Sequence, residues 1–119
     1  MPEQRSVVSI TIPAGASVSN SIDCNERSVI GFIAPDSWTT AALNIEASTN
    51  GITWITAGLL DSTNAAVGSW PSVTVNAGYS VDLSAMLPWQ FVRFRSGTAA
   101  SAVNQAVART FLVVTRPLA

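Results

Sequence analysis

Short runs of alternating apolar and polar residues, separated by glycine, proline or asparagine, fill most of the 119-residue chain. A period of two places every second side chain on the same face, which is the pattern of β-strands, and helical periodicity is nearly absent. The clearest runs are Ser6–Ile12, Arg27–Ala34, Ala41–Ser48, Gln90–Arg95 and Ala106–Thr115. With the weaker runs included, the sequence predicts eight or nine short strands in an all-β, antiparallel, jelly-roll-like sandwich.

The length suits one domain built around one hydrophobic core. No linker, charge block or internal repeat divides the sequence, so residues 1–119 are predicted to form a single β-sandwich domain. Residues 1–6 precede the first strand and are a candidate N-terminal arm, with a frayed terminus as the alternative. The core is expected to include Val29, Phe32, Leu43, Ile45, Ile52, Val92, Phe94 and Leu112.

Two segments give the most specific local predictions. Arg27–Ala34 is apolar on both faces, which is typical of a central strand. In Ala41–Ser48, apolar side chains alternate with Asn44, Glu46 and Ser48, which predicts a strand with one wet face. The Asn50-Gly51 pair that follows suits a type I′ turn, so a hairpin with a strand at Ile52–Thr56 is expected.

Weaker signals complete the chain. Ala16–Asp23 is predicted to be a weak strand, and Ala57–Pro71 a long loop because it is rich in small residues and lacks a clear period. Ser72–Val75 and Tyr79–Leu83 are predicted as two short strands, followed by one helical turn within Ser84–Trp89.

The charge content limits the partners that the chain can attract. Only 11% of residues are charged, and seven acidic against six basic residues leave a net charge of -1. All six basic residues are arginines. No basic field is therefore available for nucleic acid. No apolar run reaches the roughly 20 residues of a membrane-spanning helix, and the N-terminus lacks a secretory signal, so we expect a soluble protein made in a cytoplasm.

The residue types that most often carry catalysis are scarce. Histidine and lysine are missing, and the two carboxylate pairs considered, Asp23 with Glu26 and Asp36 with Asp61, have no convincing spacing for acid-base work. The segment Asp23 to Glu26 is better explained as a turn. The single cysteine, Cys24, is expected to be a partly buried thiol. We therefore predict no enzyme activity, no catalytic residues, no cofactor and no metal site.

Three arginines are candidate partner contacts. Arg93 and Arg95 lie two residues apart, so they leave the same face of one strand and form a two-pronged basic patch. Such a patch would suit an acidic partner surface, because a guanidinium can bind a carboxylate with two parallel bonds. The alternative is a solvated face with local acid pairing. Arg109, in the final strand, allows the same two interpretations.

Tryptophan supplies the second group of candidates. Trp38, Trp54, Trp70 and Trp89 all lie at predicted turns or strand ends. Exposed indoles could stack on sugars in a carbohydrate-binding module, whereas packing in a core or an interface is the favoured interpretation. The candidate contacts among apolar side chains are Trp38, Trp70, Leu59 and Leu60, the last three from the Ala57–Pro71 loop.

Much of the sequence resembles a group of small structural proteins encoded by tailed bacteriophages and phage-derived particles. The similarity runs from about Ile12 to Val114. Its most specific parts are Ala34-Pro35-Asp36-Ser37-Trp38, Ser48-Thr49-Asn50-Gly51, Arg95-Ser96-Gly97-Thr98 and Val103-Asn104-Gln105. Such chains are expected to have Asp-Gly at the hairpin, where this chain has Asn50. None of these parts is a catalytic signature.

The resemblance implies that the chain is a virion protein. The composition and the predicted fold imply how such a protein would act. We expect a head decoration or cement protein that bridges neighbouring subunits of the major capsid protein, binds copies of itself and works on the head surface. A fibre or spike protein is a further candidate partner. The competing hypothesis is a tail- or fibre-associated module that binds host carbohydrate.

Overall fold

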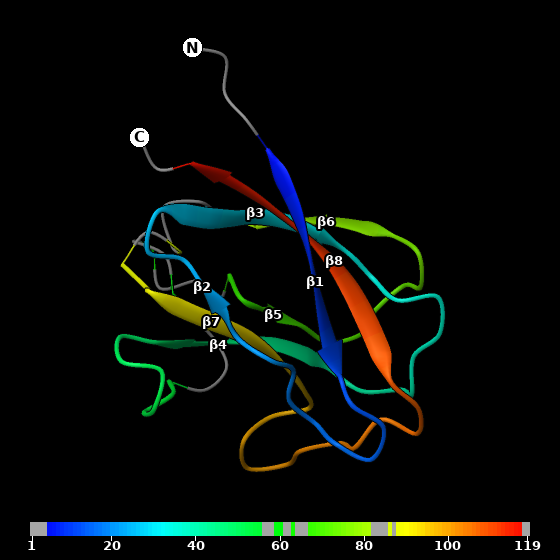
Figure 1. Cartoon of the computed structure of the whole chain (residues 1–119). Coiled ribbons are helices and arrows are strands. Elements are labelled where there is room, and N and C mark those ends of the chain that lie inside the picture. The colour runs from blue at the N-terminus through cyan, green and yellow to red at the C-terminus, as the bar shows by residue number, and fades with distance from the viewer. Residues whose placement is uncertain are drawn as a thin grey trace.

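The described residues form eight strands that pack as two sheets (Figure 1). The structure is a computed structural model that describes residues 5–55, 59–60, 63, 67–81, 86 and 88–117. The strands are β1 (Ser6–Ile12), β2 (Ile22–Asp23), β3 (Arg27–Ile33), β4 (Leu43–Ser48), β5 (Ser69–Trp70), β6 (Gly78–Ser80), β7 (Phe91–Ser96) and β8 (Arg109–Pro117). Among these residues, no helix is long and apolar enough to cross a bilayer.

The strand order confirms the predicted jelly-roll-like sandwich. One four-stranded sheet has the order β1-β8-β3-β6 and the other has the order β2-β7-β4-β5, with antiparallel pairing throughout. This order follows from one long hairpin, in which β1 pairs with β8, β2 with β7, β3 with β6 and β4 with β5, rolled so that alternate pairs fall in opposite sheets.

Aromatic side chains from both sheets meet between the layers. The ring of Phe32 on β3 lies 4.9 Å from the rings of Tyr79 and Phe94, 5.1 Å from Trp70 and 5.9 Å from Phe111, measured between centroids. Trp70 and Phe94 belong to one sheet, whereas Tyr79 and Phe111 belong to the other. Phe32 therefore connects the two layers at the centre of the core.

The strongest strand predictions are confirmed. The first strand has the predicted bounds, and Arg27–Ala34 becomes β3, which lies between β8 and β6. The weak strand predicted for Ala16–Asp23 shortens to β2 and one isolated bridge between Val18 and Arg95. Pairing is irregular at Ser19: its backbone N–H donates to the Phe94 carbonyl over 2.9 Å, but the Phe94 N–H donates to the Ser19 hydroxyl instead of to a backbone carbonyl.

The predicted wet face of β4 is wrong. All six residues of the strand are buried, including Asn44, Glu46 and Ser48, which are at most 1% exposed. Their side chains point away from the sandwich core, because Leu43 and Ile45 alternate with them on the inner face. On this outer face, the Arg93 and Arg95 side chains of β7 bind the Glu46 carboxylate and remove it from solvent.

The turn after β4 forms, but not with the predicted geometry. The chain reverses after Ser48, and the backbones of Ala47 and Ile55 exchange two hydrogen bonds of 3.2 and 2.8 Å. Gly51 has a positive φ of 76°, whereas Asn50 does not, so the predicted type I′ turn is wrong. The predicted strand Ile52–Thr56 is reduced to the single bridge at Ile55, and Thr56 lies outside the described residues.

Two of the eight expected core residues lie on the surface. Ile52 is 82% exposed because it stands at the tip of the turn, before the bridge to β4. Leu112 is 39% exposed because β8 turns Phe111 and Val113 into the core, which leaves Leu112 on the outer face. The other expected core residues are buried: Val29, Phe32, Leu43, Ile45, Val92 and Phe94.

The segment between β4 and β7 departs most from the sequence prediction. The predicted loop at Ala57–Pro71, partly outside the described residues, contains the short strand β5. The strand predicted for Ser72–Val75 is absent, and Tyr79–Leu83 is represented by β6. Most of the helical turn predicted within Ser84–Trp89 lies outside the described residues, which show helical geometry only at Met86.

Candidate functional site

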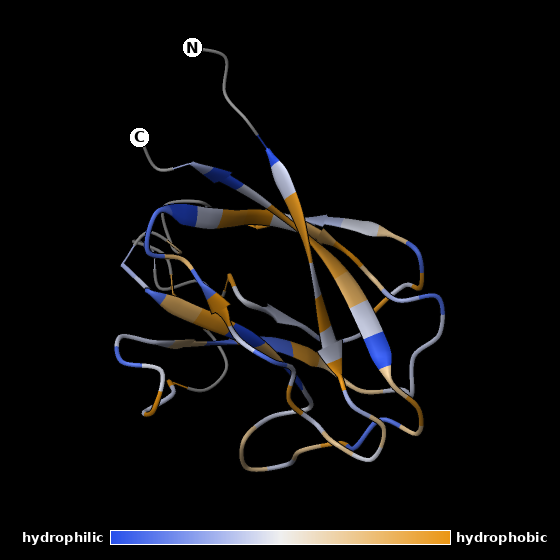
Figure 2. Cartoon of the chain, viewed as in Figure 1, coloured by the Kyte–Doolittle hydropathy of each residue, from blue (hydrophilic) through white to orange (hydrophobic). Residues whose placement is uncertain are grey.

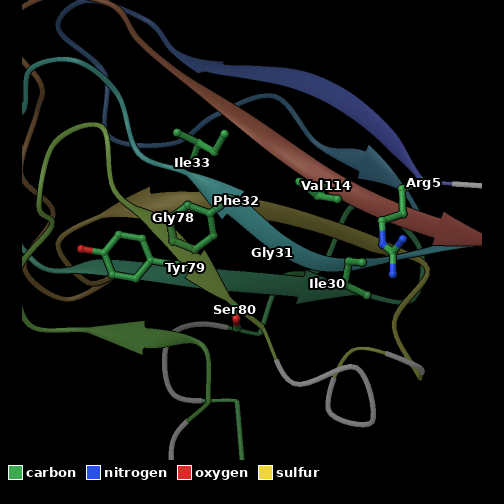
Figure 3. Close-up of a pocket in the computed structure, with 9 residues that line it drawn as sticks. All are labelled: Arg5, Ile30, Gly31, Phe32, Ile33, Gly78, Tyr79, Ser80 and Val114. Atoms are coloured by element: carbon green, nitrogen blue, oxygen red, sulfur yellow. The ribbon is translucent and has the colours of Figure 1, made fainter.

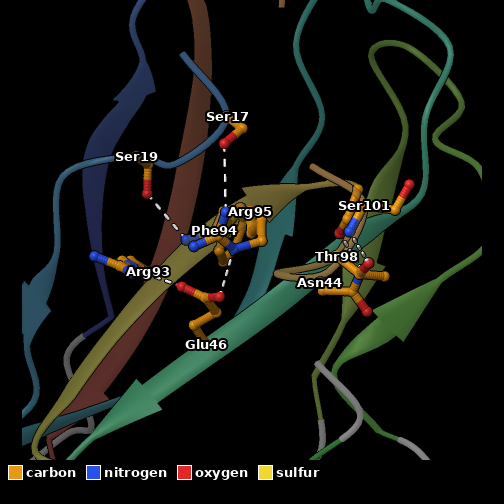
Figure 4. Close-up of polar contacts among 10 residues, drawn as sticks. Ser17, Ser19, Asn44, Glu46, Arg93, Phe94, Arg95, Thr98 and Ser101 are labelled. Carbon is orange, nitrogen blue, oxygen red and sulfur yellow. Dashed lines mark hydrogen bonds and ion pairs between the residues drawn. The ribbon is translucent and has the colours of Figure 1, made fainter. Parts of the chain in front are cut away.

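Arg93 and Arg95 lie side by side on the outer face of the β2-β7-β4-β5 sheet and share one carboxylate (Figure 4). The register of β4 and β7 places Glu46 opposite Arg93. Arg93 Nε donates to Glu46 Oε1 over 2.7 Å, and Arg95 Nε donates to Glu46 Oε2 over 2.5 Å. The patch predicted from sequence is thus an Arg-Glu-Arg ion cluster with one net positive charge.

The cluster is largely withdrawn from solvent. The Glu46 side chain is fully buried, and those of Arg93 and Arg95 are 20% and 15% exposed. The Arg93 guanidinium lies 4.2 Å above the ring of Trp54, and Arg95 Nη1 donates to Ser17 Oγ over 3.3 Å. The buried carboxylate therefore binds β7 to β4 through the two arginines.

Sequence reasoning missed Glu46 as part of this site. Its alternation with apolar neighbours indicated a solvated strand face. The pairing partner of β4 lies more than forty residues further along the chain, at Phe91–Ser96, and only that register shows which arginines cover the carboxylate. The Arg-x-Arg spacing was the available signal. Two arginines on one strand face can be buried together only if an acidic side chain lies near them.

Arg109 belongs to a second, separate polar network. It is buried, and its Nε donates to Gln105 Oε1 over 3.0 Å, while Nη2 donates to Thr39 Oγ1 over 3.0 Å and Nη1 donates to Ser37 Oγ. Gln105, fully buried, also donates to Ser96 Oγ over 2.7 Å. These contacts tie the start of β8 to the segment that follows β3, so Arg109 is engaged inside the molecule.

The tryptophans do not form a row of exposed rings. Trp38, Trp70 and Trp89 are partly buried and pack against the core. The indole N–H of Trp38 donates to the Ala41 carbonyl over 3.1 Å, and Trp54 lies under the Arg93 guanidinium. This arrangement agrees with the favoured packing interpretation and leaves no extended platform for a sugar among the residues that the structure describes.

Leu59 and Leu60 of the loop lie in different environments. Leu59 is buried in the core cluster, whereas Leu60 is 57% exposed. Of the two, only Leu60 remains available to a partner. The tip of the preceding turn also exposes Ile52 and, at 47%, Ile55, which sequence reasoning did not select as contacts.

The turn that presents Ile52 is held by side-chain hydrogen bonds. Ser48 Oγ accepts from the backbone N–H groups of Asn50 and Gly51 over 3.2 and 2.9 Å. Asn50 Oδ1 accepts from the N–H groups of Ile52 and Thr53, both over 2.8 Å. The exposed isoleucine therefore stands on a fixed backbone.

The carboxylates do not gather into a reactive site within the described part of the chain. Asp23 and Glu26 are both exposed, and Asp23 Oδ1 accepts from the N–H of Asn25 over 3.0 Å, which is the turn geometry expected from the sequence. Asp36 is exposed, and Asp61 lies outside the described residues. No group of three potential metal ligands occurs in the described part of the chain.

The buried thiol of Cys24 gives a testable prediction. Burial and, to a lesser degree, the neighbouring charge of Asp23 raise the pKa of Cys24 from 9.0 to about 11. Well below pH 9, the thiolate fraction is therefore about 100-fold smaller than that of an unperturbed thiol. We expect iodoacetamide at pH 8 to modify the native protein at least that much more slowly than the urea-unfolded chain. Mass spectrometry would measure both rates, and equal rates would contradict the burial.

The comparisons with known proteins show a shared fold. No known family profile matches the chain, and no curated protein sequence matches it. Among solved structures, the crystal structure of the SPBc2 prophage-derived protein YomS is similar, with a TM-score of 0.57 over 98% of this chain and 97% of that chain. The two sequences are 12% identical, so this likeness concerns the architecture: both chains have this small β-sandwich fold along nearly their whole lengths.

Proposed function

We propose that the chain is a non-enzymatic structural protein of a bacteriophage particle, which acts on the head as a decoration or cement protein. The sequence resembles small structural proteins of tailed phages, and YomS, which has a similar fold, is prophage-derived. A fold alone does not define a function. The proposal therefore rests on these two likenesses together with the surface that the fold presents.

The observation that carries the mode of action is the exposed Ile52 on its fixed turn. A large apolar side chain held out from a rigid backbone loses little conformational entropy on binding, which is what a protein-protein anchor requires. Ile55 and the Arg93-Trp54 pair lie in and beside the same turn. This surface suits a coat protein surface with an apolar pocket and a carboxylate at its rim.

A cement protein needs rigid contacts and no reactive groups. Glu46, Arg93 and Arg95 on the β2-β7-β4-β5 sheet bind one another, and the Arg109 network fixes the start of β8. The ion cluster and the Arg109 network therefore both make the sandwich more rigid. We place the protein on the head surface of the virion after its synthesis in the cytoplasm of the bacterial host.

Cryo-electron microscopy of particles assembled with and without the chain tests the proposed location. We expect additional density at the junctions between capsomers when the chain is present. Density found only at the tail would overturn the head assignment while leaving a virion role in place. No density anywhere on the particle would overturn both.

The proposed anchor predicts a specific loss of binding. Ile52→Asp should weaken attachment to shells that lack the chain by at least about tenfold, because a charged group would replace the apolar anchor of the contact. Val107→Asp is a matched control, since Val107 is also an exposed apolar loop residue, at 54% exposure. Co-sedimentation with the shells would measure both, and an equal effect of the two substitutions would rule out Ile52 as the anchor.

A further inference from the structure

The outer face of the β1-β8-β3-β6 sheet exposes apolar side chains in the part of the chain that the structure describes. The strand register lines up Val7, Val114 and Gly31 in one row across three strands, and Ser9, Leu112 and Ile33 in the next. Val7, Ile33 and Leu112 are 62%, 41% and 39% exposed. These central rows contain no charged residue, so this face is a candidate contact surface that the Ile52 turn does not use.

Two shallow hollows run along this face and meet at Ile33. The first, of about 300 Å³, is lined by residues that include Arg5, Ile30, Val114 and Ile33 (Figure 3). In that view Arg5 and Ile33 lie toward opposite ends of the hollow. The second, of about 350 Å³, continues from Ile33 and Leu112 to Asp36. The apolar surface thus has a basic residue at one end and an acidic residue at the other.

Measured along the strands, the two charges lie at similar distances from the centre of the face. Arg5 immediately precedes the Ser6–Thr115 pair, and Asp36 follows the Ile33–Leu112 pair by three residues. Counted along β8, the midpoint between them falls near Leu112. Figure 2 shows hydrophobic segments along this middle part of β8, between hydrophilic segments near its start and near its end.

We infer that this face binds the same face of a second copy of the chain, with the strands of the two copies antiparallel. A two-fold axis that lies in the interface and runs across the strands would place Arg5 of each copy against Asp36 of the other. The Ile33–Leu112 pairs would meet near the axis. Two opposite-charge contacts would then flank an apolar centre, and a net charge of -1 causes little repulsion between copies.

The size of the face predicts a weak dimer. Strands about 4.8 Å apart with a rise of about 3.4 Å per residue give this sheet a footprint on the order of 400 Å². Stable interfaces bury about 800 Å² on each partner, so self-association is expected in the micromolar range or weaker. The inference does not depend on the virion role, because it concerns the purified chain and uses the sheet opposite the proposed coat contact.

A charge-exchange experiment tests the antiparallel arrangement. Analytical ultracentrifugation at about 10 to 500 µM protein should show a concentration-dependent dimer of the unmodified chain. Arg5→Glu and Asp36→Arg should each weaken the homodimer at least about tenfold, because each places like charges at both flanking contacts. An equimolar mixture of the two variants should form a heterodimer at least as readily as the unmodified chain forms its dimer, because both contacts are then attractive.

The single variants separate this arrangement from a parallel one. A parallel pairing would set position 5 against position 5 and position 36 against position 36, so each single variant would only exchange one like-charge contact for another and would not weaken the homodimer. Circular dichroism would show whether both variants keep the β-sheet spectrum, and both substitutions are at exposed positions. An unmodified chain that stays monomeric over the whole range, or a mixture that associates no better than the separate variants, would overturn the inference.

Discussion

Removing the shared carboxylate, by Glu46→Ala, is expected to lower the free energy of unfolding by about 3 to 5 kcal/mol. The substitution leaves two guanidiniums, with side chains only 20% and 15% exposed, next to one another without their counter-charge. Like charges at this separation repel, and burial prevents water from screening them fully. Urea unfolding monitored by tryptophan fluorescence would measure the change.

Matched variants distinguish the ion cluster from ordinary loss of a side chain. Glu26→Ala removes an exposed glutamate and should change stability by less than about 0.5 kcal/mol. Arg93→Met should cost less than Glu46→Ala, because Glu46 keeps its bond to Arg95. If Glu46→Ala does not fold, Glu46→Gln keeps the shape and one acceptor and allows the same comparison. An effect of Glu46→Ala no larger than that of Glu26→Ala would contradict the buried cluster.

Alternation along single strands was sufficient to predict the class of fold. Ser6–Ile12 has alternating apolar side chains and Arg27–Ile33 is apolar on both faces, and both form strands that end at turn residues. The order of the strands in the two sheets also agrees with the expected jelly roll. The residue pattern of the single strands and the strand order of the two sheets therefore indicate the same fold.

Errors in the core prediction have a common physical origin. In Phe111-Leu112-Val113-Val114, both faces of the strand are apolar, so the pattern does not determine which face enters the core. The observed parity buries Phe111 and Val113 and exposes Leu112. The position of β8 between β1 and β3 determines which of its two apolar faces points outward.

Errors at the candidate site arise from side chains that compete with regular pairing. Asn50 accepts two backbone hydrogen bonds, which bends the chain and lifts Ile52 out of the expected strand. Glu46 is hidden by arginines of a strand that is distant in sequence. The Asn50 contacts are local but do not follow from alternation, whereas the Glu46 contacts lie far outside the short window in which alternation is read.

The two contact surfaces lie on opposite sides of the sandwich. The proposed coat contact uses the turn after β4, whereas the proposed self-contact uses the outer face of the sheet that contains β1, β8, β3 and β6. A protein with both contacts could link subunits of a shell that it decorates. Many copies bound to one shell, as proposed, would be held close together, so a contact that is weak in solution would form there.

The aromatic centre gives the second large expected effect. Phe32→Ala should lower the free energy of unfolding by about 3 to 5 kcal/mol, because a fully buried ring would leave a cavity that the two sheets cannot close. The ring contacts aromatic side chains of both layers, so its loss weakens the packing of one sheet on the other. Phe91→Ala is the matched control, since Phe91 is only partly buried and its removal should cost clearly less. Urea unfolding of both variants provides the measurement, and equal losses of stability would show that Phe32 is not the link between the layers.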